Sequence, residues 1–520
     1  MNKSRKKKHS QSSTFVSSYK KTHKQKQKQA TASSVPTDHS SLVSNLISIQ
    51  PLEPLMIRDG RPFHKTPGIR AHTMGHLSPT TLAGTIRTML YKKAGIDAPS
   101  VRSDGSAQSS QPTSDQQIQS FAPLDRTAIS RLAIRGPLYR WQGSLYFPIP
   151  QDMELNKIKS SEASSDRYAL NIITPVPDHS TDVGCYGVGR DGQLEHVLWP
   201  PYVEDDTSYT KPLESHRQPA YVSEQWMYHW LCSPKMAKDM HNDELQHWLH
   251  GTTFNLASRT SSATTILDAS HRDHPVQPAP SFMNSFVREQ RTHIQMDTER
   301  HTAQDQHLFS TESLVFPEGL TIEAQIESRF NVWQAHGLSS VDELHSLGGK
   351  RRLARFKEQK PMIHNSNRQS NTTDVNDFWQ SPPKTLLKKL KNSTYLRLIL
   401  ATPAYFTKGW KPGWLNEELQ SGDHLKRWAP GLELRLRWAC LPRWQPVSGY
   451  ATANGNQEKS IRRMVPAGSV YFFEVITGQD QVGTFVRNTW LKPISDGNRR
   501  GEAHDAEDGY GLALWGVWEQ

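Results

Sequence analysis

The chain has 520 residues and a formal net charge of +11, and only 35% of its residues are apolar. This length allows two or three domains, and the low apolar share indicates sizeable polar inserts. Residues 1–42 hold ten lysines and arginines against one aspartate, so this segment carries +9 and the rest of the chain about +2. A basic segment rich in serine and glutamine cannot bury enough apolar surface to fold. We expect a disordered tail that either attracts RNA without sequence preference or keeps the chain soluble.

The three cysteines, Cys185, Cys232 and Cys440, lie far apart and form no CxxC pair. They indicate neither a zinc site nor a disulfide framework, so we expect a protein of the reducing cytoplasm. No apolar run approaches about 18 residues, and the basic N-terminus has no apolar core behind it. We therefore expect no metal, no cofactor, no secretory signal and no membrane partner.

The best-marked helix begins at Pro79, after a strand expected at 46–49 where apolar and polar residues alternate. Ser78 is a good N-cap residue, and Pro79 suits the first helical position because no amide donor is needed there. Gly95 is a suitable C-terminal cap. Four apolar residues share one face of this helix: Leu82, Ile86, Met89 and Leu90.

A basic turn at 58–63 separates the strand from the helix and carries two guanidinium groups and an aromatic ring. Arginines bind phosphate through a fork of donors, and a ring stacks on a base, so this turn is a candidate RNA contact. If it folds back towards the helix start, the free amides there also favour an anion. The alternative is an ordinary surface turn. The candidate residues are Arg58, Arg61, Phe63 and His64.

The middle of the chain alternates short ordered stretches with polar ones. Residues 136–152 predict two strands joined by a turn, and residues 221–230 a short helix. Residues 187–192 match GxGxxG, but an extended stretch follows where a dinucleotide site needs a helix. Three segments rich in serine, glutamine, histidine or proline predict polar inserts: 99–119, 256–281 and 358–383.

A glycine pair, Gly348 and Gly349, precedes three cations: Lys350, Arg351 and Arg352. Glycine lets the backbone approach a ligand closely, so this loop is a second candidate for binding an anion. The alternative is an ordinary hairpin turn. Beyond it the sequence predicts four strands, at 395–401, 432–438, 469–476 and 512–518, and one weak helix at 414–428. Arginines on the wet face of the second strand either meet phosphates or are simply solvated.

These motifs, in this order, resemble a RAMP-superfamily CRISPR family: the Cmr-complex subunit of type III-B systems that holds the 5′ end of the guide RNA. The likeness covers most of residues 45–520 outside the inserts, and it rests on the shared order of the motifs rather than on any one of them. His293 stands where the family usually has glycine, and Lys350 where it has an acidic residue. The matching segments are the RDGRPF turn at 58–63, STTLAG-like residues 78–84, the GPL…YFPxPxD hairpin at 136–152, the segment 291–309, the loop 347–354, the VPAGSVYF segment 465–472, and the glycine-rich loop 509–516.

The resemblance implies an α+β fold of two ferredoxin-like, RRM-like RAMP domains, at 43–300 and 301–520, behind a disordered tail at 1–42. It implies a non-catalytic subunit that grips the 5′ repeat-derived tag of the crRNA. Its partners would be the large polymerase/cyclase-type subunit, the backbone RAMP subunit and, indirectly, target RNA. Besides the turn at 58–63, the RNA-binding residues would be Ser78, Thr80, Thr81, Gly348, Gly349, Lys350, Arg351, Arg352, Gly509 and Gly511.

Two other functions stay open. One is a RAMP-type endoribonuclease that processes crRNA precursors, for which His64, His72, His76 and Tyr91 are candidate acid or base groups. His72 and His76 also have a metal-like spacing, but no acidic third ligand has suitable local spacing. The other is a free-standing RNA-binding protein. Sequencing of co-purified RNA separates the Cmr subunit from the free-standing protein. A shared 5′ tag supports the subunit, and heterogeneous RNA supports the free-standing protein.

Overall fold

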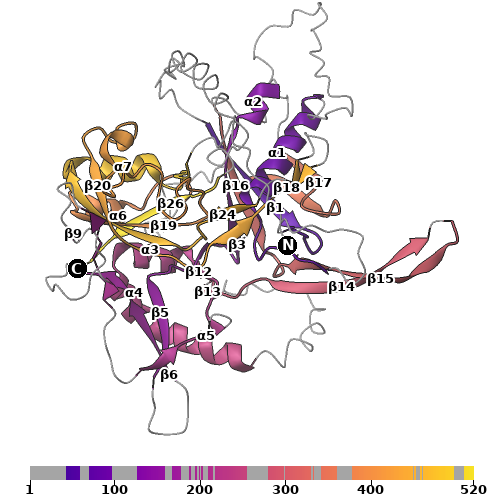
Figure 1. Cartoon of the computed structure of the whole chain (residues 1–520), viewed down its shortest axis with the longest axis horizontal. Coiled ribbons are helices and arrows are strands. Elements are labelled where there is room, and N and C mark those ends of the chain that lie inside the picture. The colour runs from indigo at the N-terminus through magenta and orange to yellow at the C-terminus, as the bar shows by residue number, and fades with distance from the viewer. Residues whose placement is uncertain are drawn as a thin grey trace, which may run out of the picture. The chain divides into compact units, whose positions relative to one another are not determined.

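The computed structural model describes residues 43–58, 70–96, 126–158, 167–176, 187–188, 194–195, 198–199, 201–202, 209–214, 217–254, 279–297, 299–328, 332, 341–359, 378–448, 450–451, 457–458, 461–496 and 509–519. The predicted tail at 1–42 and the insert at 99–119 lie outside these residues, as do 256–278 and 360–377 of the other two inserts. The insert predicted at 358–383 is wrong at both ends, because residues 358 and 359 belong to a strand and Phe378 and Trp379 are buried. The fold is mixed α/β, with several antiparallel sheets and few helices (Figure 1).

The larger sheet has eight strands in the order β13-β12-β4-β3-β16-β1-β18-β17, and every neighbouring pair is antiparallel. Ile47 and Ile49 of β1 are fully buried at its centre, as expected for a strand paired on both edges. The strands are β1 (Val43–Pro51), β3 (Ala133–Trp141), β4 (Ser144–Pro148), β12 (Tyr221–Ser223), β13 (Phe282–Met283), β16 (Thr321–Ser328), β17 (Asp342–Ser346) and β18 (Leu353–Gln359).

Helix α1 (Pro79–Lys93) confirms the helix predicted from the sequence, and its apolar face packs on the larger sheet, where Leu82 and Ile86 are fully buried. Ser78 occupies the N-cap position, but its side chain makes no capping hydrogen bond. Its hydroxyl lies 2.9 Å from the hydroxyl of Tyr510 instead. Ser78 therefore stands at the predicted N-cap position, but its hydroxyl ties the helix start to Tyr510 rather than capping a backbone amide.

The second sheet has four antiparallel strands in the order β20-β25-β19-β26. They confirm the four strands predicted in the C-terminal half: β19 (Tyr395–Leu400), β20 (Glu433–Cys440), β25 (Val470–Thr477) and β26 (Ala513–Val517). Helices α3 (Glu224–Cys232), α6 (Lys384–Leu390) and α7 (Val482–Thr489) pack on it. The helix predicted at 414–428 is wrong, because that stretch forms turns and the short 3₁₀ helix η3 (Gly422–Leu425).

A buried ion pair joins the hairpin after β4 to the second sheet. Asp152 is fully buried and pairs with Arg397 of β19, which is 1% exposed. The indole of Trp230 donates to Asp152 at 3.0 Å, and Arg397 also donates to the carbonyls of Trp230 and Val517, at 2.5 and 2.7 Å. Every charged atom of this pair therefore meets a partner, which is the condition for holding two charges out of water.

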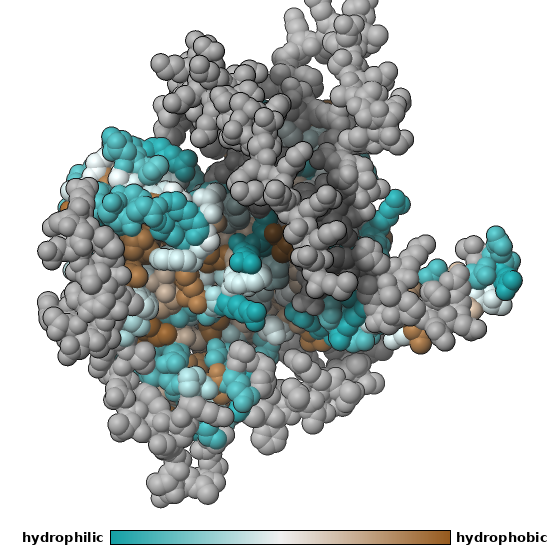
Figure 2. All heavy atoms as spheres, viewed as in Figure 1, coloured by the Kyte–Doolittle hydropathy of each residue, from teal (hydrophilic) through white to brown (hydrophobic). Residues whose placement is uncertain are grey.

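Strands β14 (Val287–Asp297) and β15 (Thr302–Val315) form a long hairpin, here called the arm, and β2 (Arg70–Ala71) pairs with β15 in parallel. Figure 1 shows the arm extending away from the larger sheet, and Figure 2 shows hydrophilic side chains at its tip. The predicted domain boundary near residue 300 falls at this tip. Strands β16, β17 and β18 return to the sheet of β1, and all four strands of the second sheet follow Gln359.

The remaining elements are short. The described residues include no helix long and apolar enough to cross a membrane. The small strands pair as β5 (Met153–Ile158) with β6 (Arg167–Ile172) and β11 (Tyr209–Pro212), β7 (Thr174–Pro175) with β10 (Pro201–Tyr202), β8 (Gly187–Val188) with β9 (Leu194–Glu195), β21 (Gln445–Val447) with β24 (Arg462–Met464), and β22 (Tyr450–Ala451) with β23 (Gln457–Glu458). The other helices are α2 (Arg126–Ser130), α4 (Pro234–Met240), α5 (Asn242–Phe254) and the 3₁₀ turn η4 (Gln479–Gln481).

Candidate nucleic-acid interface

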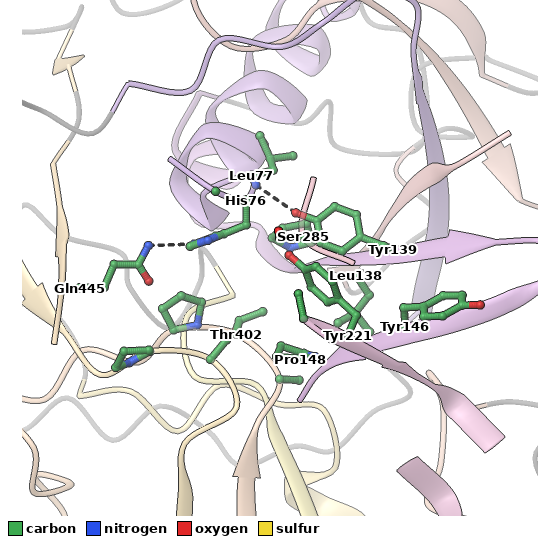
Figure 3. Close-up of a pocket in the computed structure, with 17 residues that line it drawn as sticks. His76, Leu77, Leu138, Tyr139, Tyr146, Pro148, Tyr221, Ser285, Thr402 and Gln445 are labelled. Atoms are coloured by element: carbon green, nitrogen blue, oxygen red, sulfur yellow. Dashed lines mark hydrogen bonds between the residues drawn. The ribbon is translucent and has the colours of Figure 1, made fainter. Parts of the chain in front are cut away.

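A pocket of about 240 Å³ lies between the residues that lead into α1 and the loops of the second sheet (Figure 3). Its walls come from segments hundreds of residues apart, which only the folded chain brings together. Most of the wall is apolar or aromatic, with a small number of polar groups, which is the usual composition of a ligand site. The residues used below are His76, Leu77, Tyr139, Tyr221, Gln445 and Ala467.

Two tyrosines form the aromatic side of the pocket. The hydroxyl of Tyr139 accepts a hydrogen bond from the amide of Leu77 at 3.0 Å, and the rings of Tyr139 and Tyr221 meet edge to face with centroids 5.4 Å apart. Burial raises the pKa of both phenols above its ordinary value. These side chains therefore stay neutral and present ring surface rather than charge.

His76 and Gln445 supply the polar side. The Gln445 side-chain nitrogen lies 3.3 Å from Nε2 of His76, and Figure 3 shows the two side chains meeting across the pocket. Burial, and then the charge of Arg288, lowers the pKa of His76 to about 4. The imidazole is therefore neutral near pH 7, and because an amide nitrogen only donates, Nε2 of His76 is the acceptor.

Arg288 of the arm lies beside the pocket. Its guanidinium nitrogen is 3.4 Å from the place that a Cβ on Gly75 would occupy, and Gly75 itself lines the pocket. The side chain is exposed, and among the described residues no carboxylate forms an ion pair with it. An unpaired guanidinium at the edge of a neutral pocket is a ready site for a phosphate oxygen.

Arg291 and His293 lie on the other face of the arm from Arg288, because successive side chains of a strand point to opposite faces. Arg291 pairs with Glu289 at 2.7 Å. His293 stacks on Phe309, with centroids 5.1 Å apart, and lies 2.8 Å from the hydroxyl of Thr311. Burial, and then the charges of Lys350, Arg291 and Arg352, lowers the pKa of His293. This face of the arm therefore lies close to the turn between β17 and β18.

The predicted glycine loop forms that turn, and its glycines approach the chain itself. A Cβ on Gly348 would lie 2.7 Å from the carbonyl oxygen of Met56, and the amide of Gly349 donates to the same oxygen at 2.7 Å. Arg352 forms an ion pair with Glu53. Lys350 and Arg351 adopt left-handed backbone angles, with φ of 57° and 51°, and are exposed. Within the described part of the chain no ion pair engages either of these two cations.

The start of α1 meets the closing glycine-rich loop through Tyr510. This ring is fully buried, and its hydroxyl lies 2.9 Å from both Ser78 and Thr80. Gly509 and Gly511 are buried, and a Cβ on Gly509 would lie 2.6 Å from the carbonyl oxygen of Ile134. A side chain at either glycine would therefore clash within the protein, and the two glycines let Tyr510 pack under α1. Thr81 is half-buried on the same helix.

Of the predicted turn at 58–63, only Arg58 is described, in a bridge with Thr73; Arg61, Phe63 and His64 lie outside the described residues. The fold brings Arg58 close to the glycine loop, because Met56 bridges to Gly349. Sequence reasoning missed the pocket. Tyr139 belongs to the GPLY motif, which predicted only a strand. Arg288, Tyr221 and Gln445 belong to no motif that predicts a binding site.

The three candidate catalytic residues that the structure describes lie in different surroundings. His72 pairs with Glu312 at 3.3 Å, His76 lies in the pocket, and Tyr91 is buried in the core around α1. His64 is outside the described residues. Across the described residues no group of three histidine, cysteine, aspartate or glutamate side chains could hold a metal ion.

The chain was compared with known proteins. The model of the family described as "CRISPR-associated protein (Cas_Cmr3)" matches residues 47–518. A search of the curated proteins found no match. Among solved structures, a chain of a "Type III-B Cmr-beta bound to cognate target RNA" is 13% identical, with 82% of this chain and 86% of that chain covered and a TM-score of 0.33. A chain of the same assembly with target RNA and AMPPnP is 11% identical, with the same coverage and TM-score. Likenesses at this level carry no argument.

Proposed function

Because the chain belongs to the Cas_Cmr3 family of CRISPR-associated proteins, we propose that it is a non-catalytic RNA-binding subunit of a type III-B effector complex. It holds the 5′ repeat-derived tag of the crRNA and bridges the large polymerase/cyclase-type subunit to the backbone RAMP subunit. One observation carries this proposal beyond family membership: exposed cations with no ion-pair partner in the described residues lie beside an aromatic pocket (Arg288) and at the turn between β17 and β18 (Lys350 and Arg351).

The strand order supports an RNA-recognition type of fold. Four strands of the larger sheet, taken in chain order as β1, β3, β16 and β18, lie in the spatial order second, third, first, fourth. The second sheet, taken as β19, β20, β25 and β26, has the same order. Helix α1 connects the first and second strands of one set, and α7 the third and fourth of the other. We infer that each set is a ferredoxin-like unit, of which the described residues include one of the two connecting helices.

The charge pattern suits a phosphate backbone. Arg288, Lys350 and Arg351 are exposed cations, and each phosphate that a cation neutralises releases a bound counterion. The neighbouring rings and the neutral pocket suit unstacked bases, which is how proteins read single-stranded RNA. Phosphate contacts would set the register of the tag, and base contacts its identity.

The same geometry argues against catalysis. Metal-free RNA cleavage needs a base for the 2′-hydroxyl and an acid for the leaving oxygen, both poised near the working pH. Burial and Arg288 hold the pKa of His76 at about 4, so this imidazole cannot act as an acid near pH 7. His72 lies against Glu312 and is not among the residues that line this pocket.

Purifying the protein with its natural partners and sequencing the bound RNA tests the proposal. A shared 5′ tag supports it, and heterogeneous RNA contradicts it. The triple variant Arg288→Ala/Lys350→Ala/Arg351→Ala should bind guide RNA more weakly and flatten the log–log salt dependence by about 2, at about 0.7 per phosphate contact. The matched control removes three exposed cations, Lys384 and Lys388 of α6 and Lys391 at its C-cap.

If the control weakens binding as much as the triple variant does, the interface is misplaced. The isolated chain, incubated with labelled repeat RNA with and without divalent metal, should cut nothing. Specific cutting that His76→Ala abolishes would favour the endoribonuclease instead.

A further inference from the structure

We infer that the pocket of Figure 3 takes one unstacked nucleobase with an adenine-type edge, and that Arg288 binds the phosphate of the same nucleotide. This inference rests on the proposed function in that the guide RNA is the expected source of the base. It goes further by naming the chemistry that one site selects.

Size limits the occupant. Sites for drug-sized ligands hold about 300–1,000 Å³, so a pocket of about 240 Å³ suits something smaller, such as one base without its neighbours. Its walls are rings and apolar side chains rather than charges, and a flat heteroaromatic ring loses little by leaving water there. A stacked dinucleotide would not fit, so the base must leave its stack to enter.

The polar side gives the pocket a preference. With one amide hydrogen on Nε2 of His76, Gln445 keeps its second N–H and its carbonyl oxygen for a ligand. A glutamine amide pairs with adenine through one donor and one acceptor, at N7 and N6 of the base. Since Nε2 of His76 accepts, its proton sits on Nδ1 and the imidazole orients Gln445 without adding charge. Guanine would place an acceptor, O6, where adenine places its donor.

The cation supplies the second half of a nucleotide site. Arg288 lies against Gly75, which has no side chain to keep the guanidinium away from the pocket edge. Exposed Ser285 belongs to the same edge and leaves it open to solvent. Arg288 therefore lies where the phosphate of a nucleotide would leave the pocket. Neither part alone would distinguish a nucleotide from any small aromatic molecule, but together they do.

The first arm of the test uses free nucleotides and the full-length chain. Adenosine 5′-monophosphate should bind more tightly than guanosine 5′-monophosphate or ribose 5-phosphate in calorimetric titrations. Its affinity should fall at least about fivefold in Gln445→Ala, the loss expected for one bidentate base contact. Ala467→Leu, which fills the pocket without removing a polar group, should abolish binding. Gln290→Ala, an exposed amide on the arm outside the pocket, is the matched control.

The second arm uses the assembled complex with its guide RNA. One adenine of the tag should be protected from dimethyl sulfate and become reactive in both Gln445→Ala and Ala467→Leu, with unchanged thermal melting of the protein. Protection in the complex without binding of the free nucleotide supports the site with RNA as its source.

No protected adenine and no nucleotide binding, while a tagged guide RNA still co-purifies, would overturn the pocket and leave the proposed function standing. Heterogeneous RNA together with specific binding of adenosine 5′-monophosphate would overturn the proposed function and leave the pocket standing.

Discussion

The ion pair between Asp152 and Arg397 should be one of the most sensitive points of the fold. Replacing Arg397 by methionine keeps an unbranched apolar stem but removes the guanidinium that Asp152 faces. Asp152 is fully buried, so its carboxylate would lose its cationic partner and keep the Trp230 indole, and the carbonyls of Trp230 and Val517 would each lose a donor. Breaking a buried pair by removing one partner costs about 3–5 kcal/mol, a large share of the 5–15 kcal/mol that stabilises a typical protein.

Urea unfolding of four proteins measures this effect: the native chain, Arg397→Met, Asp152→Asn and the double variant. We expect the double variant to lose less than the sum of the single losses, because neither charge is then left alone, with a coupling of about 1–3 kcal/mol. The matched control is Arg355→Met, which breaks the exposed pair with Asp342, whose side chains are 53% and 38% exposed. That pair should contribute below about 1 kcal/mol. Equal losses for Arg397→Met and Arg355→Met, or additive single losses, would refute the reasoning.

Four further predictions concern the pH dependence, a glycine, the tail and the turn. Burial raises the pKa of Glu224 from 4.5 to about 7, so its contribution to the free energy of unfolding is present below pH 4.5 and is lost as the pH rises through 7. In unfolding measured from pH 4 to 8, Glu224→Gln should remove up to about 3 kcal/mol of this pH-dependent loss of stability. Gly509→Ala should lower stability by about 2 kcal/mol or more, because φ is 79° and the Cβ meets Ile134, whereas Gly319→Ala, at a φ of 75° with open space, should lose only the backbone part of about 1 kcal/mol. Deleting residues 1–42 should flatten the salt dependence of RNA binding without changing the melting temperature; a sharp drop in melting temperature would contradict the assignment of a disordered tail. Changing Arg58 and Arg61 together to alanine should weaken guide-RNA binding by about 2–5 kcal/mol while circular dichroism stays unchanged; unchanged affinity in a folded variant would make the turn structural.

Local patterns predicted the elements that local chemistry determines. Helix α1 was visible because Ser78, Pro79 and Gly95 mark its ends and apolar residues follow its face. Helix α6 was missed, since seven residues are too few for a periodic pattern to stand out. The stretch at 414–428, predicted as a weak helix, forms turns whose apolar side chains pack into the core, so tertiary contacts decided its structure.

The site was predictable only in part, because its cations belong to a short sequence motif whereas the residues of its pocket are scattered along the chain. Lys350 and Arg351 belong to a short motif, and their charge and neighbouring glycines mark them in the sequence. The pocket has no such mark. His76 meets Gln445 from 369 positions away, and Leu77 meets Tyr139 from 62. No spacing rule connects residues so distant in the sequence. The pairing of β16 with β1 is equally long-range and had no mark in the sequence.

The place of β1 in the larger sheet has a consequence for synthesis of the chain. Ile47 pairs on one side with Ala324 and on the other with Glu358, so neither edge of β1 has its neighbour until hundreds of later residues exist. At about 5–20 residues per second, a ribosome needs on the order of 15–60 s to make the intervening segment. For that time an apolar strand has two open edges, which is the kind of segment that associates with other chains. The nascent protein should therefore depend on a chaperone that covers residues 43–51 until β16 and β18 emerge.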